Sequence, residues 1–481
     1  MAVKVVKQPA PPKGRLGVPE LYALAVGQVI GAGVITLVVP SIKMTGYSAW
    51  LAYFAAIVMG FIMISPVMFI SSALRLGSGD YSVLAAMSGP KAAGIFSFCY
   101  LTQCMSLSLF GTSAAAYLGD VFPILGGTMM RIIIGVSLLV IFYIINLCGI
   151  DIMAGAQKLM TWLLIAALLL FTIFGLMQRS LPIFDTSNSQ WLTQGWGITF
   201  KNGKIVGGFF GATLLFIYST QGYRMTSAYG ASSMNARRDI PLAILMTVPT
   251  LIVLYCGVAM AGSGVMTIEE YGSSTTLTFA AQRIFPAWLY YFFIVGGPIM
   301  ALLSTLNSSF AYNSILIGHS CDDGWLPVSF GRKNRNGARQ WILTYMFCIA
   351  IIPIVMGFSI TVITNMIQLI GAFLSFLYVS AYIRMPKTYP DAWKKARLHV
   401  SDGIYYACCI LSFIGYGIVF WKSILSINTH LAIINVSALL ILSALGIWRT
   451  RTGNIVIHTC LWTEEDEIEA NKVRATTMST N

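Results

Sequence analysis

The sequence predicts an all-α polytopic membrane protein with twelve transmembrane helices, and three observations support this fold class. The 481 residues are 57% hydrophobic and only 10% charged, with a mean hydropathy of +0.76, whereas a soluble domain carries about 25% charged residues. Apolar runs long enough to cross a bilayer recur along the whole chain. Lys and Arg residues concentrate in alternate connecting segments, as the positive-inside rule requires of a multi-pass protein.

The apolar runs form two groups that are separated by a polar segment. The first five runs cover about residues 18–42, 48–74, 92–119, 129–149 and 157–178. Residues 179–204 then form a polar loop, which we expect to be extracellular. The remaining seven runs cover about residues 205–232, 240–263, 287–318, 341–358, 361–384, 403–424 and 430–449. Because twelve is an even number, both termini should lie on the same side of the membrane.

The distribution of basic residues predicts which side that is. With the N-terminus inside, cytoplasmic segments hold 22 of the 30 Lys and Arg residues and outer segments hold seven. Residues 1–17 and 450–481 are therefore predicted to be cytoplasmic tails of a protein in the plasma membrane or the bacterial inner membrane. The net charge of +13 is explained by topology and by lipid headgroups, so no nucleic-acid partner is expected. The acidic cluster at residues 464–469 is expected to belong to a solvated tail.

The first apolar run contains the sequence Gly27-Gln28-Val29-Ile30-Gly31-Ala32-Gly33-Val34 at its midpoint. Each glycine weakens a helix by roughly 1 kcal/mol, so the backbone is expected to unwind there. The half-helix that follows would offer free N–H groups and a partial positive charge to a carboxylate. The alternative is a close-packing face formed by the Gly-x-x-x-Gly pair.

The sixth run is interrupted in a similar way. Ser219, Thr220, Gln221 and Gly222 follow one another at mid-span and indicate a second broken helix. The first and sixth runs occupy matching positions if residues 18–178 and 205–384 are two five-helix repeats of opposite orientation. Matching interruptions in inverted repeats are the best sequence indicator of a transporter's binding site. Residues 385–449 add two helices outside the repeats.

Four motifs, in this order along the chain, resemble those of the amino acid–polyamine–organocation transporters. They are the glycine-rich first span, Gly77-Ser78-Gly79-Asp80-Tyr81 with Gly89-Pro90, Asn235-Ala236-Arg237-Arg238-Asp239-Ile240-Pro241, and Asp322-Asp323-Gly324-Trp325-Leu326-Pro327. The resemblance covers about residues 18–340. It implies a five-plus-five inverted repeat of the leucine-transporter type, which moves amino acids or related amines by alternating access.

The resemblance also assigns contacts to an amino acid substrate. The substrate carboxylate would bind the backbone N–H groups of Gly31, Ala32 and Gly33. Its amino group would bind carbonyls of Ile30 and of Tyr218, Ser219 and Thr220. Tyr218 would be an aromatic gate over the substrate; the alternative is an aromatic residue packed within the bundle.

Two departures from the family pattern affect charge recognition and coupling. Arg224 stands where family members commonly carry Glu, Asp or Asn, and Leu164 stands where some members carry a lysine. Arg224 is either a counter-charge for an acidic substrate, or a vestibule residue that pairs with an acid such as Asp239 or with a loop carbonyl. The sequence does not decide whether transport is coupled to protons or sodium, or whether it proceeds by exchange or symport. It also leaves open whether the protein forms a homodimer.

The remaining pocket candidates carry neutral polar or aromatic side chains, which suit a substrate with a neutral side chain. These candidates are Gln28, Gln103, Ser106, Phe110 and Asn307. Ser304, Thr305 and Ser308 form a candidate sodium site, although hydroxyl groups on helices more often bond back to their own backbone. A polyamine is less expected, because we find no mid-span acid to pair with a dication. No His, Cys or acid constellation suggests an enzyme or a cofactor; a precursor–product antiporter and a non-transporting receptor remain alternatives.

Overall fold

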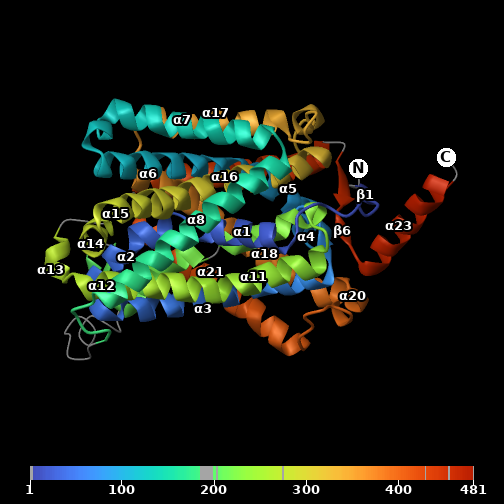
Figure 1. Cartoon of the computed structure of the whole chain (residues 1–481). Helices are drawn as coiled ribbons and strands as arrows, with labels where there is room; N and C mark the ends of the chain where they lie inside the picture. Colours follow the sequence, from blue (N-terminus) through green and yellow to red (C-terminus); the bar gives the residue numbers. More distant parts are fainter. Residues whose placement is uncertain are drawn as a thin grey trace.

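The computed structural model describes residues 4–184, 199–201, 204–220, 222–272, 276–427, 429–452 and 455–479. Its long helices run roughly side by side in one bundle (Figure 1). The first half contains α1 (Val18–Val29), α2 (Ala32–Thr45), α3 (Ala49–Ala73), α4 (Asp80–Met87), α5 (Pro90–Cys99), α6 (Ser106–Val121), α7 (Thr128–Leu147) and α8 (Ile150–Met177).

The second half begins with a hairpin of two antiparallel strands, β3 (Thr199–Lys201) and β4 (Lys204–Gly207). It continues with α10 (Phe209–Ile217), α11 (Ala236–Leu251), α12 (Gly257–Val265), α13 (Ile268–Tyr271), α14 (Thr278–Ile284), α15 (Ala287–Ile294) and α16 (Met300–Asp322). The last helices are α17 (Gln340–Val355), α18 (Ile360–Tyr382), α19 (Met385–Thr388), α20 (Pro390–Lys394), α21 (Asp402–Ser426), α22 (Thr429–Thr452) and α23 (Glu464–Ser479).

Within the described residues, nine helical stretches are long and apolar enough to cross a membrane. They match nine of the twelve predicted spans and confirm a multi-pass, all-α membrane protein. The first and sixth predicted spans fall outside this set because each is divided into shorter helices. The ninth falls outside because α17 has 16 residues. The count of twelve crossings and the inverted repeat stay predictions.

Two long helices are widened by proline. Ile252–Cys256, between α11 and α12, is a π-helical turn that closely follows Pro249. Val295–Ile299, between α15 and α16, is a second π-helical turn and contains Pro298. Proline has no N–H and its ring clashes with the preceding turn, so the helix widens locally and continues. Such turns often occur at functional sites.

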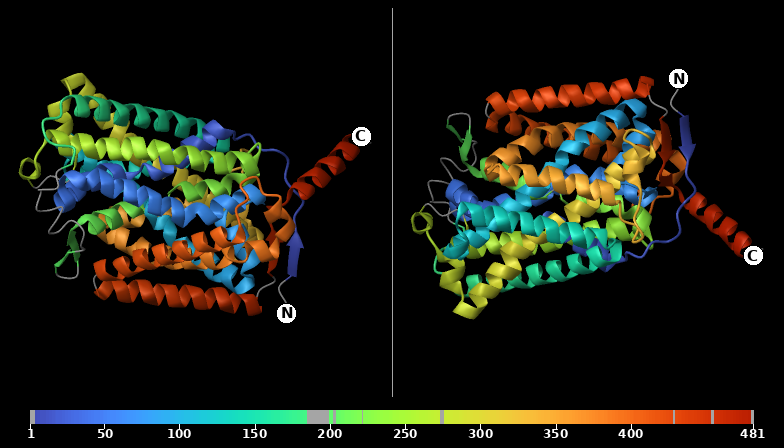
Figure 2. Two further views of the ribbon diagram at one scale, coloured as in Figure 1. Left: turned by 90° about the horizontal axis from the view of Figure 1, so that it is seen from below. Right: turned by 90° about the horizontal axis from the view of Figure 1, so that it is seen from above.

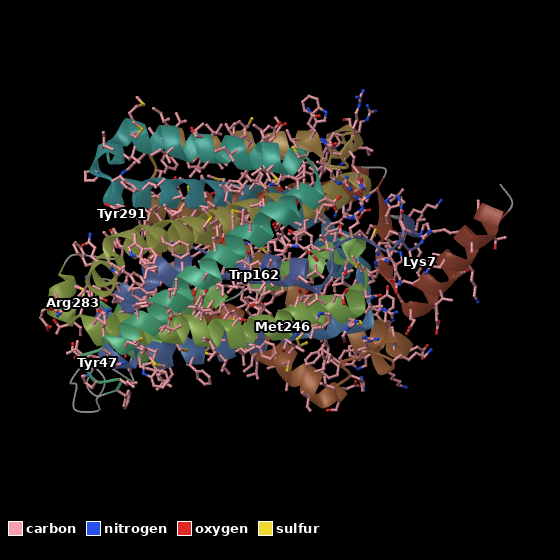
Figure 3. All side chains as sticks on the ribbon, in the orientation of Figure 1. Lys7, Tyr47, Trp162, Met246, Arg283 and Tyr291 are labelled. Carbon is pink, nitrogen blue, oxygen red and sulfur yellow. The ribbon has the colours of Figure 1, made fainter. Side chains whose placement is uncertain are left out.

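Burial separates a central group of helices from a peripheral one. Helix α1 is almost fully buried from Leu21 onward, and most of α16 is also buried, whereas α22 lies at the edge of the bundle (Figure 2). Trp162 and Met246, both exposed, project from the outer surface between the two ends of the bundle (Figure 3). Apolar side chains on such a surface suit contact with lipid.

The two tails meet at one end of the bundle, which we call the tail end (Figure 1). There β1 (Lys4–Lys7) pairs in parallel with β5 (Val456–Thr459), and β2 (Arg75–Leu76) pairs antiparallel with β6 (Leu461–Trp462). Lys7 lies at this end, whereas Tyr47, Arg283 and Tyr291 lie at the opposite end (Figure 3). The termini therefore share one end; its assignment to the cytoplasm stays a prediction.

The expectation of a solvated acidic tail is wrong for Asp466 and Glu467 in the first turn of α23, which are 19% and 25% exposed, whereas Glu464 and Glu465 are exposed at 61% and 76%. Four acids of this turn form ion pairs with basic residues of four other segments. The pairs are Lys7–Asp466 at 2.7 Å, Arg75–Glu467 at 3.1 Å, Arg237–Glu464 at 3.2 Å and Lys395–Glu465 at 2.8 Å. The charge pattern of the tail alone could not reveal these partners, because they are distant in the sequence.

Candidate functional site

The first predicted span is interrupted at the glycine-rich sequence. Helix α1 ends at Val29, and α2 begins at Ala32. The N–H of Ile30 donates to the carbonyl of Val26 at 2.8 Å, and that of Gly31 donates to Val29 at 2.9 Å. The N–H groups in the first turn of α2 have no acceptor within their own helix. In this conformation a carboxylate would therefore meet N–H donors from Ala32 onward, since the Gly31 N–H is already used.

The sixth predicted span is interrupted as well. Helix α10 ends at Ile217 and is followed by 3₁₀ segments at Tyr218–Thr220 and Gly222–Ser232, with Gln221 outside the described residues. The Ser219 hydroxyl donates to the carbonyl of Phe216 at 2.8 Å, and the Thr220 hydroxyl donates to that of Ile217 at 2.9 Å. These side chains satisfy carbonyls that the end of the helix leaves without an amide partner.

A tyrosine that the sequence analysis did not select connects the two interruptions. The hydroxyl of Tyr255 lies 2.9 Å from the carbonyl oxygen of Val29 and 3.3 Å from that of Ser219. Tyr255 is fully buried and belongs to the π-helical turn that closely follows Pro249. Its phenol therefore holds the end of α1 against the interruption in the sixth span. The sequence shows Pro249, but it does not show that the side chain of Tyr255 points toward the two interruptions.

The glycines also allow close packing. The first span therefore combines a broken helix with a close-packing face, which were two alternative predictions for these glycines. A Cβ on Gly33 would lie 2.1 Å from the Cβ of Ser219, and one on Gly31 would lie 2.6 Å from Oγ1 of Thr305. A Cβ on Gly27 would lie 2.0 Å from Nε2 of Gln157. The glycines thus let the interrupted helix approach α8, α16 and the sixth span closely.

Most of the predicted site residues line one cavity of about 240 Å³ beside the two interruptions. The predicted residues on its wall are Gln28, Gly31, Gly33, Gln103, Ser106, Phe110, Ser219, Arg224 and Thr305. Residues that the sequence analysis did not name also line it, among them Tyr100, Ser309, Asn313, Gln368, Tyr378 and Tyr416. Among the described residues on this wall, Arg224 is the charged one and the others are neutral.

Several predicted residues lie behind this wall. Asn307 is fully buried and donates to Oε1 of Gln157 at 3.0 Å and to the carbonyl of Met153 at 3.1 Å. Thr220 faces α3, where its hydroxyl oxygen also lies 3.2 Å from the carbonyl oxygen of Ala56. Ile30 is also buried and does not line the cavity. The side chains of Tyr218 and Ala32 lie outside the described part of the structure, so the gate at Tyr218 stays a prediction.

The candidate sodium residues cluster against α1. The hydroxyls of Ser304 and Thr305 donate to the carbonyl of Gly27 at 3.2 and 2.9 Å, and each also lies within hydrogen-bond distance of the Ala301 carbonyl. Ser308 contacts the side-chain oxygen of Gln28. In this arrangement the hydroxyls act as hydrogen-bond donors that join α16 to α1.

Arg224 lines the cavity and forms a buried ion pair. Its Nε lies 3.2 Å from Oδ2 of Asp80, and the two side chains are 16% and 0% exposed. Asp80 also accepts hydrogen bonds from Tyr312, at 3.4 Å, and from Tyr382. Asp80 belongs to one of the family-like motifs, but the partners expected for Arg224 were Asp239 or a carbonyl. The fold brings Asp80 to it from α4.

Aromatic rings complete the surroundings of Arg224. Its guanidinium carbon lies 4.5 Å from the ring centre of Tyr378 and 5.9 Å from that of Tyr416. The Tyr416 hydroxyl accepts a hydrogen bond from Nη1 at 3.3 Å. The cation is thus held by one carboxylate and two aromatic faces. Since Asp80 balances its charge, the cavity presents little net charge to a substrate.

Comparisons with known proteins give a family match and a distant relative. Residues 16–448 match the protein family described as amino acid permease. The uncharacterized protein MJ0609 of Methanocaldococcus jannaschii is 23% identical over 338 residues, which cover 66% of this chain and 71% of that protein.

Proposed function

The chain belongs to the amino acid permease family, within the amino acid–polyamine–organocation superfamily, and from that premise we propose that it transports amino acids with uncharged side chains by alternating access. The observation that carries the substrate proposal is the neutral cavity beside two interrupted helices. The first turn of α2 offers N–H groups and a partial positive charge to a carboxylate. The end of α10 carries a partial negative charge, which favours an ammonium group.

The Arg224–Asp80 pair supports an uncharged substrate side chain. An acidic side chain would have to compete with Asp80, which is fully buried and already bonded to Arg224. A second ammonium group, as in a polyamine, would meet no carboxylate on the described wall of the cavity. An unpaired charge is costly in a site removed from water. Neutral amides and hydroxyls from Gln103 and Ser106 instead suit a small polar or apolar side chain.

A flux assay with the full-length protein in liposomes tests this proposal. Radiolabelled alanine, glutamine, glutamate and putrescine are offered to proteoliposomes and to empty liposomes, with and without each unlabelled compound inside. The proposal predicts uptake of the neutral amino acids alone. Saturable binding without uptake under any gradient or internal substrate would favour a receptor, and uptake of putrescine alone would contradict the proposal.

The same assay distinguishes exchange from symport. Uptake that requires unlabelled amino acid inside the liposome indicates exchange. Uptake driven by a proton or sodium gradient without internal substrate indicates symport. We propose the plasma membrane or the bacterial inner membrane as the location, with both tails in the cytoplasm. The excess of basic residues in the alternate segments supports this orientation.

A further inference from the structure

A second polar cavity lies at the tail end. It has a volume of about 360 Å³ and is bounded by the N-terminal tail, the start of α11, the segment after α20 and the first turns of α23. We call it the basic groove, because six basic side chains and only two acidic ones line it. The basic residues are Lys13, Arg75, Arg237, Arg238, Lys395 and Arg397, and the acidic residues are Glu464 and Glu467.

Arg75 has a structural role in this groove. Its guanidinium is buried and donates to the carbonyls of Pro11, Pro12, Gly230 and Ala231, as well as to Glu467. All the donors of its planar group are therefore engaged. Burial lowers the pKa of Arg75 from its ordinary value, and repulsion from the nearby cations Arg474 and Arg237 lowers it further. Attraction to Glu467 acts in the opposite direction. The groove is thus crowded with positive charge even with α23 in place.

The other cations of the groove fall into two groups, those that pair with acids of α23 and those that form no such pair. Arg237 pairs with Glu464 and Glu467, and Lys395 pairs with Glu465. The side chains of Lys13, Arg238 and Arg397 are exposed and make no hydrogen bond or close ion pair with any described residue. Arg397 attracts Glu464 at longer range. Two guanidinium groups and one ammonium group consequently face a cavity large enough for a phosphate and its substituent. Arginine binds phosphate oxygens in a bidentate geometry that matches its planar fork.

The groove lies beside a surface that suits lipid. Leu245 and Met246 of α11, two to three turns from its start, are 37% and 44% exposed. Met246 lies between the two ends of the bundle (Figure 3). A phospholipid could therefore place its acyl chains along α11 and its headgroup in the groove. Basic pockets between helices at the cytoplasmic surface are typical sites for anionic headgroups.

We propose that the basic groove binds the phosphate of an anionic ligand, from a lipid headgroup or a soluble organic phosphate, and that the acids of α23 compete for its cations. Arg238 and Arg397 hold the phosphate, and Lys13 adds to the positive field. Glu464 occupies Arg237, which a bound phosphate would otherwise share. This site lies apart from the cavity of the proposed substrate.

Binding to the purified full-length protein tests the proposal by native mass spectrometry. The probes are phosphatidylglycerol, phosphatidylcholine and ATP, each titrated against the unmodified protein and three variants. Arg238→Gln/Arg397→Gln should weaken binding of the anionic probe about tenfold or more, since charged hydrogen bonds are lost. Glu464→Gln should strengthen it. The matched control is Arg332→Gln/Arg335→Gln, which removes two exposed cations at the same end but outside the groove.

The probes identify the source of the phosphate. Retention of phosphatidylglycerol but not ATP assigns the groove to a lipid headgroup, and the reverse result assigns it to a soluble phosphate. Equal loss in the groove variant and the control would overturn the proposal, as would phosphatidylglycerol and ATP both binding no better than phosphatidylcholine. Thermal stabilisation by an amino acid is measured in parallel and shows whether each variant is folded. The proposed transport function is tested separately, by the flux assay.

Discussion

Replacing Asp80 by Asn should destabilise the protein and, at the same time, alter its preference among substrates. The substitution keeps the size of the side chain but removes its charge. Arg224, whose side chain is 16% exposed, then has no carboxylate partner. Breaking a buried ion pair from one side costs about 3–5 kcal/mol. The ring of Tyr378, 4.5 Å from the guanidinium carbon, contacts the cation before and after the substitution, so the expected loss stays at about 3–5 kcal/mol.

A double-mutant cycle measures the pairing itself. Arg224→Gln alone leaves a buried carboxylate, and the double variant removes both charges. If the pair is formed, the double variant should be less destabilised than the sum of the single variants by more than about 1 kcal/mol. Unfolding of the detergent-purified proteins, followed by tryptophan fluorescence, provides the comparison. Additive effects within about 0.5 kcal/mol would refute the pairing.

The same variant tests the role of charge in selectivity. In Asp80→Asn the positive charge of Arg224, on the wall of the cavity, is no longer balanced. Binding of glutamate or aspartate should therefore increase relative to that of a neutral amino acid. An unchanged ratio would indicate that Arg224 does not reach the substrate.

The remaining predictions concern the interruptions and the tail. Gly33→Ala should destabilise the protein by about 1–3 kcal/mol, because its Cβ would lie 2.1 Å from that of Ser219; adding Ser219→Gly should restore part of the loss in thermal unfolding, and no recovery would refute the contact. Tyr255→Phe should lower the free energy of unfolding by about 1–2 kcal/mol and weaken amino acid binding in calorimetry. Unchanged affinity would show that substrate binding does not need the hydrogen bond of Tyr255 between the two interruptions. Hydrogen bonding to Arg237 lowers the pKa of Glu464 below its ordinary 4.5, so this contribution to docking of α23 is present above pH 4.5 and is lost as the pH falls through the lowered pKa. Protection factors of the α23 amides, corrected for the slower intrinsic exchange in acid, should therefore fall on acidification, and unchanged protection factors would contradict this prediction.

Composition and periodicity were sufficient to predict the fold class, because a bilayer imposes length and hydropathy on each span. The interruption near Gly31 could also be predicted, since glycines are costly in a continuous helix. The sequence did not indicate that Gly33 would pack against Ser219. Close approach between helices depends on the three-dimensional arrangement.

Contacts between residues that are far apart in the sequence could not be predicted. Arg224 was recognised as unusual, but its partner Asp80 is 144 positions away and comes from a loop motif. Tyr255 was hidden among apolar neighbours, because only the folded structure directs its hydroxyl to the two interruptions. The acidic first turn of α23 appeared to be an ordinary solvated tail, since its basic partners lie on four other segments.

The most direct test of the proposed substrate site is thermal stabilisation of the purified protein by the common amino acids and their decarboxylated amines. A ligand that binds only the folded protein stabilises it by about 2.7 kcal/mol at 100 times its dissociation constant. We predict that neutral amino acids raise the unfolding temperature and that the corresponding amines do not, because the amines lack the carboxylate that the first turn of α2 would bind. Stabilisation by amines alone would contradict the carboxylate site and the proposed substrate.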